Sequence, residues 1–328
     1  DLDRKISTSL SKIAEFYNKF QHRIYVSFSG GKDSTVLADL VSRICKINNH
    51  KLILWFSDTG LEYPEVREHV KSFPEYLQNK HKIEIELIMD YPKDRKGNRI
   101  TFKEIILSKG YPIISKEVAA IICDARSALK KGNLNSYALK KLNNEYRNPI
   151  TGEVSDRYNR GKWKFLLNAP FKISSQCCNV MKKNPSHKFQ KQSGLKPIIG
   201  TMACESMLRK SHWLQSGCNS FSAKYPSSKP ISFWMEQDIL EYIVKYDIPY
   251  PSVYGKIIRD KNGIYSTTGL NRTGCVFCGF GCHLEKEPNR FQRLKESHPK
   301  IWEYCMKPVE EGGIGMKKVL DYIDVESD

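Results

Sequence analysis

Apolar side chains recur along the chain at two different spacings, and these spacings predict alternating helices and strands. Residues 1–22 place apolar side chains every three or four positions, as an amphipathic helix does. Short apolar runs at 24–28, 51–56 and 83–89 instead suit buried strands, and helical patterns separate them. Because strands that alternate with helices are joined by crossover connections, the pattern predicts an α/β fold with a mostly parallel sheet.

The second half of the chain adds one strand and then becomes mainly helical. Residues 196–201 have the pattern of a further buried strand, and the tail from Pro288 has a helical pattern. We therefore expect an α/β domain at 1–230 and a C-terminal helical region at 231–328 packed on it. A basic helical and loop segment at about 118–165 is expected to be an insertion in the α/β domain.

Composition narrows the class of protein. The chain has 328 residues, 40% of them hydrophobic, which is enough for one large domain or two ordinary ones. No stretch approaches the roughly 18 apolar residues of a membrane helix, so no membrane partner is expected. The sequence begins without a hydrophobic signal region and without Met, and it therefore leaves open a targeting segment further upstream. Ten cysteines without a secretion signal favour a reducing, cytoplasmic setting, where clustered cysteines bind metals or catalyse.

The charge balance is strongly basic. The chain has 53 Lys and Arg against 36 Asp and Glu, which gives a formal net charge of +17. Such an excess attracts a polyanion, so DNA or RNA is an expected partner. The alternative is that many of the lysines only keep the protein soluble.

The most specific local pattern is the glycine turn between the apolar run 24–28 and the following helical segment. A strand, a glycine turn and a helix N-terminus bring backbone N–H groups together, and the helix dipole adds to their attraction for an anion. The turn consists of Ser29, Gly30, Gly31, Lys32, Asp33 and Ser34. Its hydroxyls and its lysine favour a phosphate ligand, although an ordinary β-turn-α corner would also use two glycines.

Cysteines gather in two distant segments. Cys177 and Cys178 are adjacent, while Cys275 and Cys278 form a Cys-x-x-Cys followed by Cys282. Four thiolates can complete a [4Fe–4S] cluster or a tetrahedral zinc site. Adjacent cysteines are unusual in zinc sites, which mostly use two spaced pairs. Cys282 is left as a substitute ligand or a catalytic thiol.

These motifs resemble those of a known family. The Ser-Gly-Gly-x-Asp-Ser turn resembles the pyrophosphate loop of N-type ATP pyrophosphatases and phosphoadenylyl-sulfate (PAPS) reductases. Residues 58–65 resemble the family's Asp-Thr-Gly-x-x-x-Pro-Glu motif, 200–209 its Gly-x-Arg-x-x-Glu-Ser-x-x-Arg motif, and 230–238 its Pro-x-x-x-Trp-x-x-x-Asp segment. The two cysteine pairs resemble the cluster-binding arrangement of adenylyl-sulfate reductases. The resemblance covers about residues 20–285 and implies the doubly wound, adenine nucleotide alpha-hydrolase-like sheet.

The resemblance also implies a set of site residues. Binding of ATP or adenylyl sulfate would fall to Ser29, Gly30, Gly31, Lys32, Asp33, Ser34, Asp58, Thr59, Gly60, Glu205, Ser206 and Arg209. Catalytic roles would fall to Lys32, Asp33, Arg209 and Cys282, and Asp58 would hold Mg²⁺ or a nucleotide hydroxyl. The ligands of the [4Fe–4S] cluster, or alternatively of zinc, would be Cys177, Cys178, Cys275 and Cys278. Met202 departs from the family's usual arginine, which weakens the case for free adenylyl sulfate.

Three functions remain open at this stage. The tail of the chain, 319–328, lacks the nucleophilic cysteine that an adenylyl-sulfate reductase carries there. The favoured hypothesis is therefore an ATP pyrophosphatase and sulfurtransferase that modifies nucleic acid, like the proteins of DNA phosphorothioation or some tRNA thiolases. A sulfur-donor protein such as a cysteine desulfurase would then be a partner, and a homo-oligomer stays open. The alternatives are a thiol-dependent adenylyl-sulfate or PAPS reductase and a non-catalytic nucleotide- or nucleic-acid-binding subunit.

Overall fold

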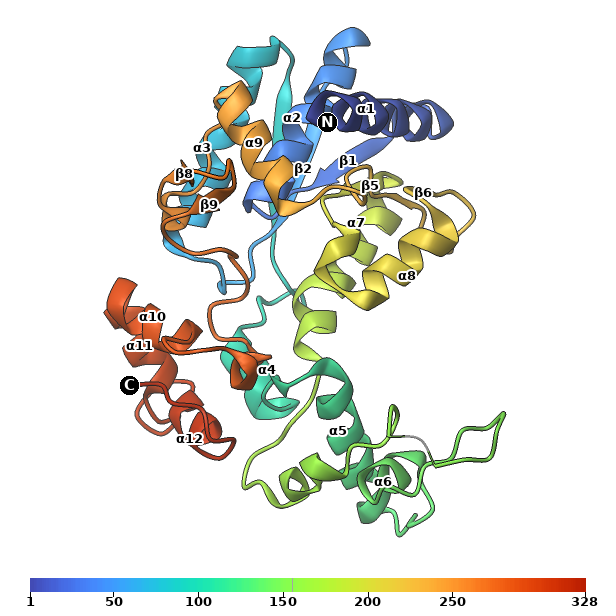
Figure 1. Cartoon of the computed structure of the whole chain (residues 1–328), viewed down its shortest axis with the longest axis vertical. Helices are drawn as coiled ribbons and strands as arrows, with labels where there is room; N and C mark the ends of the chain where they lie inside the picture. The colour runs from blue at the N-terminus through green and yellow to red at the C-terminus, as the bar shows by residue number, and fades with distance from the viewer. Residues whose placement is uncertain (155) are drawn as a thin grey trace. The chain divides into compact units, whose positions relative to one another are not determined.

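The computed structural model describes residues 1–154 and 156–328 and divides them into two compact units (Figure 1). The first, called the sheet unit here, contains residues 1–92 and 182–274. The second, called the cysteine unit, contains residues 93–181 and 275–328. Each unit is therefore built from two separate stretches of the chain.

A six-stranded sheet forms the centre of the sheet unit. Its strands, in sheet order, are β3 (Ile85–Asp90), β2 (Leu52–Ser57), β1 (Ile24–Ser27), β5 (Lys196–Ile199), β7 (Ser227–Ser228) and β6 (Asn219–Ser220). The first five strands pair in parallel, and only β6 is antiparallel to its neighbour. The register places Val26 of β1 beside Leu54 on one side and Ile198 on the other. The mostly parallel sheet expected from the sequence is thus confirmed.

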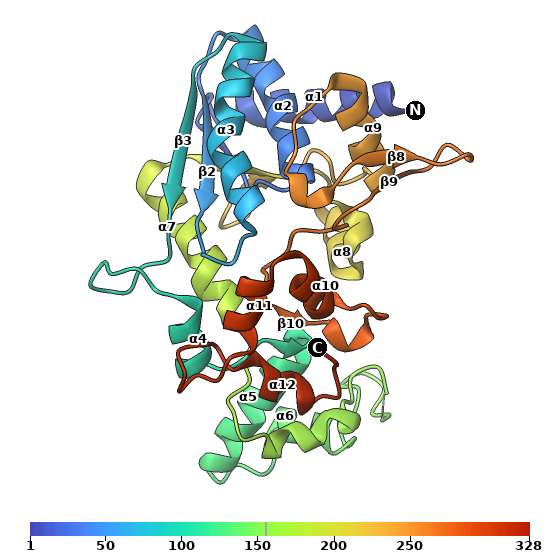
Figure 2. The same ribbon diagram turned by 90° about the vertical axis from the view of Figure 1, so that its left-hand side faces the viewer.

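Helices cover both faces of this sheet, as a doubly wound fold requires. One group packs together on one face (Figures 1 and 2): α1 (Leu2–Lys19), α2 (Lys32–Ile47), α3 (Pro64–His81) and α9 (Glu236–Tyr246). The opposite face carries α7 (Asn184–Ser193), whose Phe189 ring stacks on Trp55 with 5.6 Å between centroids. A further helix, α8 (Met207–Ser216), exposes all of its side chains at least partly.

The core of the sheet unit explains why it extends beyond the boundary expected near residue 230. Trp234, Ile239 and Tyr242 are buried in the same hydrophobic cluster as the strands and α2. Residues 231–274 therefore belong with the sheet, which corrects the expected division at 230 and 231. They also contain a turn at Ser252–Tyr254 and a hairpin of β8 (Ile257–Arg259) and β9 (Tyr265–Thr267).

The cysteine unit is mainly helical. Its elements are α4 (Phe102–Ser108), β4 (Ile113–Ile114), α5 (Lys116–Lys130), α6 (Tyr137–Leu142), a 3₁₀ helix (Gly161–Asn168), β10 (Gly279–Phe280), a short 3₁₀ turn (Cys282–Leu284), α10 (Arg290–Ser297), α11 (Pro299–Met306) and α12 (Met316–Asp321). The segment 118–165, expected as an insertion in the α/β domain, belongs to this unit.

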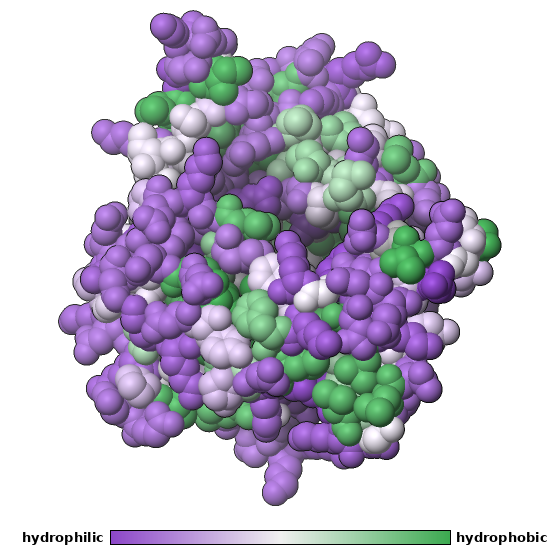
Figure 3. Space-filling view, turned by 60° about the horizontal axis from the view of Figure 1, so that its bottom comes forward, coloured by the Kyte–Doolittle hydropathy of each residue, from purple (hydrophilic) through white to green (hydrophobic). Residues whose placement is uncertain are grey.

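Among the described residues, no helix is both long and apolar enough to span a membrane. On the face drawn in Figure 3, hydrophilic side chains predominate and hydrophobic ones form separate patches.

Candidate nucleotide site and cysteine cluster

The glycine loop lies at the point where the sheet changes direction. From β1 the chain passes to β2 and β3 on one side, whereas β5 pairs with the other side of β1. In open parallel sheets, ligands bind beyond the carboxyl ends of the strands at such a switch point. Gly200, at the end of β5, lies so close that a side-chain carbon there would be 3.3 Å from the backbone of Asp33. The loop predicted from the sequence thus occupies the position where this fold binds ligands.

Its own side chains hold the loop tightly. The Ser34 hydroxyl donates to the carbonyl of Gly31 at 2.9 Å and accepts from the backbone N–H of Ser29 at 3.2 Å. Gly30 has φ +74°, and a side-chain carbon there would lie 2.5 Å from Val70 of α3. Only glycine can adopt this conformation at such close approach without strain. The two serines and Gly30 therefore shape the loop, which is the reason for their place in the motif.

Tyr254 and Thr273, which lie more than 200 residues further along the chain, cover the loop. The backbone N–H of Lys32 donates to the hydroxyl of Tyr254 at 3.3 Å, and that hydroxyl lies 2.7 Å from the hydroxyl of Thr273. A side-chain carbon on Gly31 would be 3.2 Å from both hydroxyl oxygens. At least one amide of the predicted anion site is therefore already bonded to a hydroxyl oxygen of the protein.

Lys32 is buried and Asp33 is half-buried beside this cover. The Lys32 ammonium donates to the carbonyl of Asn271 at 2.8 Å and pairs with Glu236 at 3.1 Å. Burial raises the pKa of Asp33, and the Lys32 charge, 3.9 Å away, opposes that rise. Within the described residues, Oδ1 of Asp33 is buried and accepts no hydrogen bond. A carboxylate oxygen left without a donor is what a bound cation needs, so Asp33 fits Mg²⁺.

Asp58 is less suited to Mg²⁺ than the sequence suggested. Its Oδ2 accepts from Arg67 of α3 at 2.8 Å, and its Oδ1 accepts from the backbone N–H of Gly60 at 3.2 Å. Thr59 next to it donates its hydroxyl to Glu62 at 2.6 Å. Asp58, Thr59 and Gly60 therefore organise the turn between β2 and α3, which is the structural alternative to a ligand role.

The third motif forms a compact charged turn. Glu205 accepts from the backbone N–H of Met202 at 3.0 Å and pairs with Arg209, and Arg272 lies 3.7 Å from its other oxygen. The hydroxyl of Ser206 caps α8 by accepting from the Arg209 backbone. Burial, together with the positive charge of Arg272, lowers the pKa of Arg209. The two guanidinium groups that pair with this one carboxylate are also suited to bind the oxygens of an anionic ligand.

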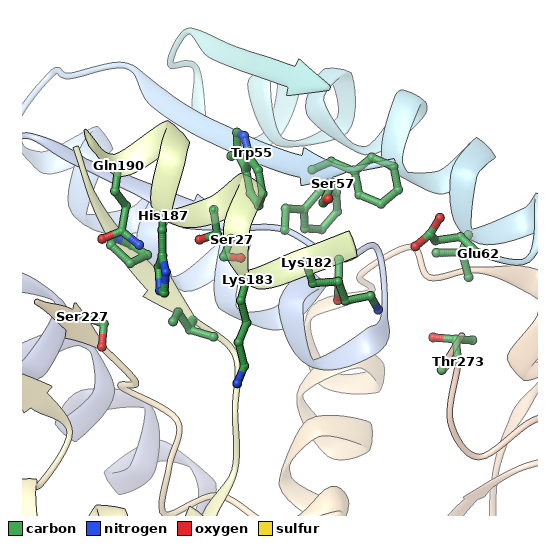
Figure 4. A pocket seen from close by; sticks show the side chains of 18 of the residues that line it. Ser27, Trp55, Ser57, Glu62, Lys182, Lys183, His187, Gln190, Ser227 and Thr273 are labelled. Carbon is green, nitrogen blue, oxygen red and sulfur yellow. The ribbon is translucent and has the colours of Figure 1, made fainter. Parts of the chain in front are cut away.

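A cavity of about 350 Å³ opens at the ends of β1, β2 and β5, within the sheet unit. Its volume is that of a small-molecule pocket, and its lining is mainly apolar. Figure 4 shows the residues around it: Ser27, Trp55, Ser57, Glu62, Lys182, Lys183, His187, Gln190, Ser227 and Thr273. Ser29 also lines the cavity, so the cavity begins at the glycine loop. The space is suited to the base and sugar of a nucleotide.

Sequence reasoning missed several of these residues. Tyr254, Thr273 and Asn271 belong to no motif, and nothing local in the sequence relates them to the loop. Glu236 lies within the Pro-x-x-x-Trp-x-x-x-Asp segment but at one of its unspecified positions, so the motif does not single it out. Lys182 and Lys183 follow the paired cysteines as a short basic run, and nothing in that run relates them to the cavity that they line.

Both cysteine pairs lie in the cysteine unit and act on one another electrostatically. The Cys177 and Cys178 sulfurs are 4.0 Å apart, and this contact, with burial, raises the pKa of the Cys177 thiol. Cys275 and Cys278 also contribute to that rise. Burial raises the pKa of Cys278 to about 11, with smaller effects from Cys275 and Cys178. Grouped thiols that resist ionisation together favour a bound cation, which stabilises thiolates.

The knuckle that carries Cys275 and Cys278 is built by strand pairing. Gly279 and Phe280 pair in parallel with Ile113 and Ile114, and a side-chain carbon on Gly279 would lie 2.8 Å from a backbone oxygen. Arg290 donates to the carbonyl of Cys278 at 2.9 Å and is itself held by Glu285 at 2.6 Å. These contacts fix the knuckle before any metal binds.

The thiols are grouped but do not form a ready site for a single ion. Among the described residues, no set of three or more His, Cys, Asp or Glu side chains is placed to hold one metal ion. Cys282 is 1% exposed, its thiol lies 3.0 Å from the carbonyl of Gly279, and burial raises its pKa to about 11. The ten cysteines form no disulfide within the described part of the chain. The four paired thiols thus have the chemistry and the grouping that fit a multi-iron cluster. Cys282 fits the role of a packing residue.

Comparison with known proteins agrees with this geometry. The phosphoadenosine phosphosulfate reductase domain matches residues 23–108 and 129–280. An uncharacterized protein of Methanocaldococcus jannaschii is 22% identical over 329 residues, which cover 97% of this chain and 55% of that protein. The chain therefore spans about half the length of the curated relative that it matches.

One solved structure is also similar. The U34-tRNA thiolase NcsA from Methanococcus maripaludis, solved with its [4Fe-4S] cluster, is 14% identical with a TM-score of 0.40, covering 98% of this chain and 80% of that one. A likeness of that strength says nothing about function. The domain match covers most of the sequence, and the loop at Ser29–Ser34 lies at the switch point of the sheet. By that match, the chain belongs to the phosphoadenosine phosphosulfate reductase family.

Proposed function

We propose that this chain is an ATP pyrophosphatase that adenylates an acceptor and supports sulfur transfer to it, with DNA or RNA as the acceptor. The observation that carries the proposal is the half-buried Asp33 carboxylate, whose buried Oδ1 accepts no hydrogen bond among the described residues. It lies beside an anion-binding loop at the sheet's switch point, and burial disfavours its charge. A buried charged group persists where a ligand uses it, and a magnesium nucleotide supplies the missing cation.

The chemistry assigned to these residues is a displacement at the α-phosphorus of ATP. An acceptor oxygen bonds to that phosphorus, the bond to the β-phosphate oxygen breaks, and pyrophosphate leaves. The loop amides and Lys32 would hold the leaving pyrophosphate, while Arg209 would face its oxygens. Mg²⁺ on Asp33 would supply further charge neutralisation. A thiol reductant releases hydrosulfide from the donor protein's persulfide and is itself oxidised to a disulfide. The hydrosulfide then replaces the adenylated oxygen on the acceptor atom, and AMP leaves with that oxygen.

The four paired cysteines would hold a [4Fe–4S] cluster, which supplies a place for the incoming sulfur to bind. Zinc on the same thiols is the alternative and would make the knuckle structural. The grouping of Cys177 with Cys178, and of both with Cys275 and Cys278, supports a shared ligand.

A thiol-dependent reductase of adenylyl sulfate or PAPS is the second candidate, because it is the activity for which the family is named. Its nucleophile would have to be Cys204, which is exposed and lies close enough to Arg209 to affect its pKa. Cys282 suits the role poorly because burial keeps its thiol protonated.

One assay separates these functions. The full chain, purified without oxygen, is incubated with Mg²⁺, labelled ATP, a cysteine desulfurase, cysteine, and either DNA or tRNA. Pyrophosphate release that is lost in Asp33→Asn and kept in Asp124→Asn, a substitution of an exposed carboxylate on α5, is the expected result. In a parallel incubation with adenylyl sulfate and a thiol reductant, sulfite release that is abolished by Cys204→Ser would favour the reductase instead. Iron and sulfide analysis of the same sample identifies the metal.

A further inference from the structure

A large share of the positive charge of the cysteine unit lies in residues 130–164. Residues 130–164 contain nine Lys or Arg and three Asp or Glu, a net charge of +6. About a third of the chain's +17 therefore lies in about a tenth of its length. Lys130, Lys131, Arg157, Lys162 and Lys164 are exposed. Such a concentration is the electrostatic signature of a surface that binds a polyanion.

Aromatic side chains lie among these charges in a row. The ring of Tyr146 is 6.0 Å from that of Tyr137 and 5.9 Å from that of Tyr158. Tyr137 is 75% exposed and Tyr158 36% exposed, so these rings do not serve the core. Lys141 lies over the Tyr146 ring at 5.1 Å, and Arg157 over the Tyr158 ring at 5.7 Å. Exposed rings with cations beside them are suited to bind the bases and the phosphates of a nucleic acid.

The backbone holds this row in place. Asn159 is buried and exchanges two hydrogen bonds with the backbone of Tyr146, at 3.1 and 3.2 Å. Arg160 binds both carboxylate oxygens of Glu117, and its backbone N–H donates to the carbonyl of Lys141 at 2.8 Å. The segment is therefore anchored to α5 and α6, unlike a solvated charged loop whose rings would vary in position.

A further aromatic pair, Trp163 and His283, lies next to the cysteine knuckle. Lys162 lies over the Trp163 ring at 4.9 Å, and that ring meets the His283 ring edge-on at 5.2 Å. His283 directly follows Cys282 in the knuckle. Burial and the Lys162 charge lower the pKa of His283, so its ring is neutral near pH 7 and adds no charge there. A strand that extends to Trp163 would thus lie beside the knuckle that carries Cys275 and Cys278, in the same unit.

We propose that the surface formed by residues 130–154, 156–164 and His283 binds an unpaired stretch of nucleic acid, which is the acceptor of the proposed function. Stacking on tyrosine needs bases that are not covered by neighbouring bases, so an unpaired strand fits and a duplex does not. Only the acceptor's role rests on the proposed function, since the binding itself needs neither ATP nor the cluster. An acidic protein partner, by contrast, would bind through the Lys and Arg charges alone and would not use the tyrosine rings.

The test is a fluorescence anisotropy titration of the full chain with four labelled probes of about 20 nucleotides: an unstructured RNA, the same sequence as DNA, a DNA duplex and an RNA hairpin. The variant Tyr137→Ala/Tyr158→Ala is expected to lose at least about fivefold in affinity for the single strands, because stacking contributes about 1–3 kcal/mol per base. The variant Lys131→Gln/Arg157→Gln/Lys162→Gln should lower the salt slope by up to about two, at about 0.7 per phosphate contact.

The matched control is Lys46→Gln/Lys71→Gln, which removes two exposed charges from the sheet unit and should leave single-strand affinity nearly unchanged. Tighter binding of the RNA probe would indicate an RNA acceptor, and equal or tighter binding of the DNA strand a DNA acceptor. The proposal is overturned if no single strand binds at low salt, if the duplex binds as well as the strands, or if the tyrosine variant binds like the unmodified chain. Pyrophosphate release is measured separately, so a failed binding surface is distinguished from a failed ATP pyrophosphatase.

Discussion

The backbone N–H of Lys32 donates a hydrogen bond to the hydroxyl oxygen of Tyr254 at 3.3 Å. This N–H belongs to the glycine loop, where a phosphate oxygen would be its partner. The hydroxyl therefore stands in for a ligand atom, and Thr273, 2.7 Å from it, supports that position. Nucleotide binding must either displace Tyr254 from the amide or add the phosphate beside it, and these two outcomes can be distinguished.

Removing the Tyr254 hydroxyl should strengthen nucleotide binding. Tyr254→Phe keeps the ring over Lys32 but frees the amide, so a bound phosphate no longer competes with the protein's own hydrogen bond. One hydrogen bond contributes about 0.5–1.5 kcal/mol, which corresponds to a gain of about two- to tenfold in affinity for a non-hydrolysable ATP analogue, measured by calorimetry. Tyr265→Phe is the control. Weaker binding by Tyr254→Phe would mean that the hydroxyl contacts the nucleotide directly.

Asp33→Asn should reduce activity and raise stability together. Burial raises the pKa of Asp33 in the folded state above its usual 3.8, so folding favours the protonated form. That contribution to stability is present at low pH and is lost as the pH rises above 3.8 through the folded-state pKa.

At pH 7 the charge of Asp33 therefore lowers the stability of the folded state, and the neutral amide of asparagine does not have this effect. The melting temperature of Asp33→Asn should exceed that of the unmodified chain by about 2 °C or more at pH 7, with the gap closing toward pH 4. Pyrophosphate release should fall about a hundredfold or more. Equal melting curves at pH 7 would contradict the burial argument, and unchanged release would contradict the catalytic one.

Asp39 is predicted to have the opposite pH dependence. It is fully buried, but hydrogen bonds from His81 at 2.8 Å and Tyr242 at 2.5 Å outweigh the burial and lower its pKa. Its contribution to stability is therefore present above its usual pKa of 3.8 and is lost as the pH falls through the lower folded-state value. Asp39→Ala leaves these donors without an acceptor and should cost about 3–5 kcal/mol in urea unfolding at pH 7. Tyr242→Phe should cost less, since only one hydrogen bond is lost.

The sequence predicted those parts of the fold and site whose cause is local. The strand, Gly30 and the serine hydroxyls lie within a few residues of one another, so their pattern is visible in the chain. The cover over the loop was not predicted, because Tyr254 and Thr273 reach Lys32 only through the packing of α9 and the β8–β9 hairpin. The boundary near 230 was misplaced for the same reason: Trp234 and Tyr242 look like helix residues, and only tertiary packing shows that they complete the core of the sheet.

The two cysteine pairs should behave differently from Cys282 when substituted. Replacing Cys177, Cys178, Cys275 or Cys278 by alanine removes a thiol from the group and should lower iron and acid-labile sulfide to near zero in anaerobic preparations. Cys282→Ala should keep both, because that thiol is buried and already bonded to the Gly279 carbonyl. The iron and sulfide content of Arg290→Lys should lie between those two results, because lysine cannot bind the Cys278 carbonyl and Glu285 together as the guanidinium does. Visible absorption follows the cluster through the same series. Zinc in place of iron would make the knuckle a structural site, and loss of iron in Cys282→Ala would make that cysteine a ligand.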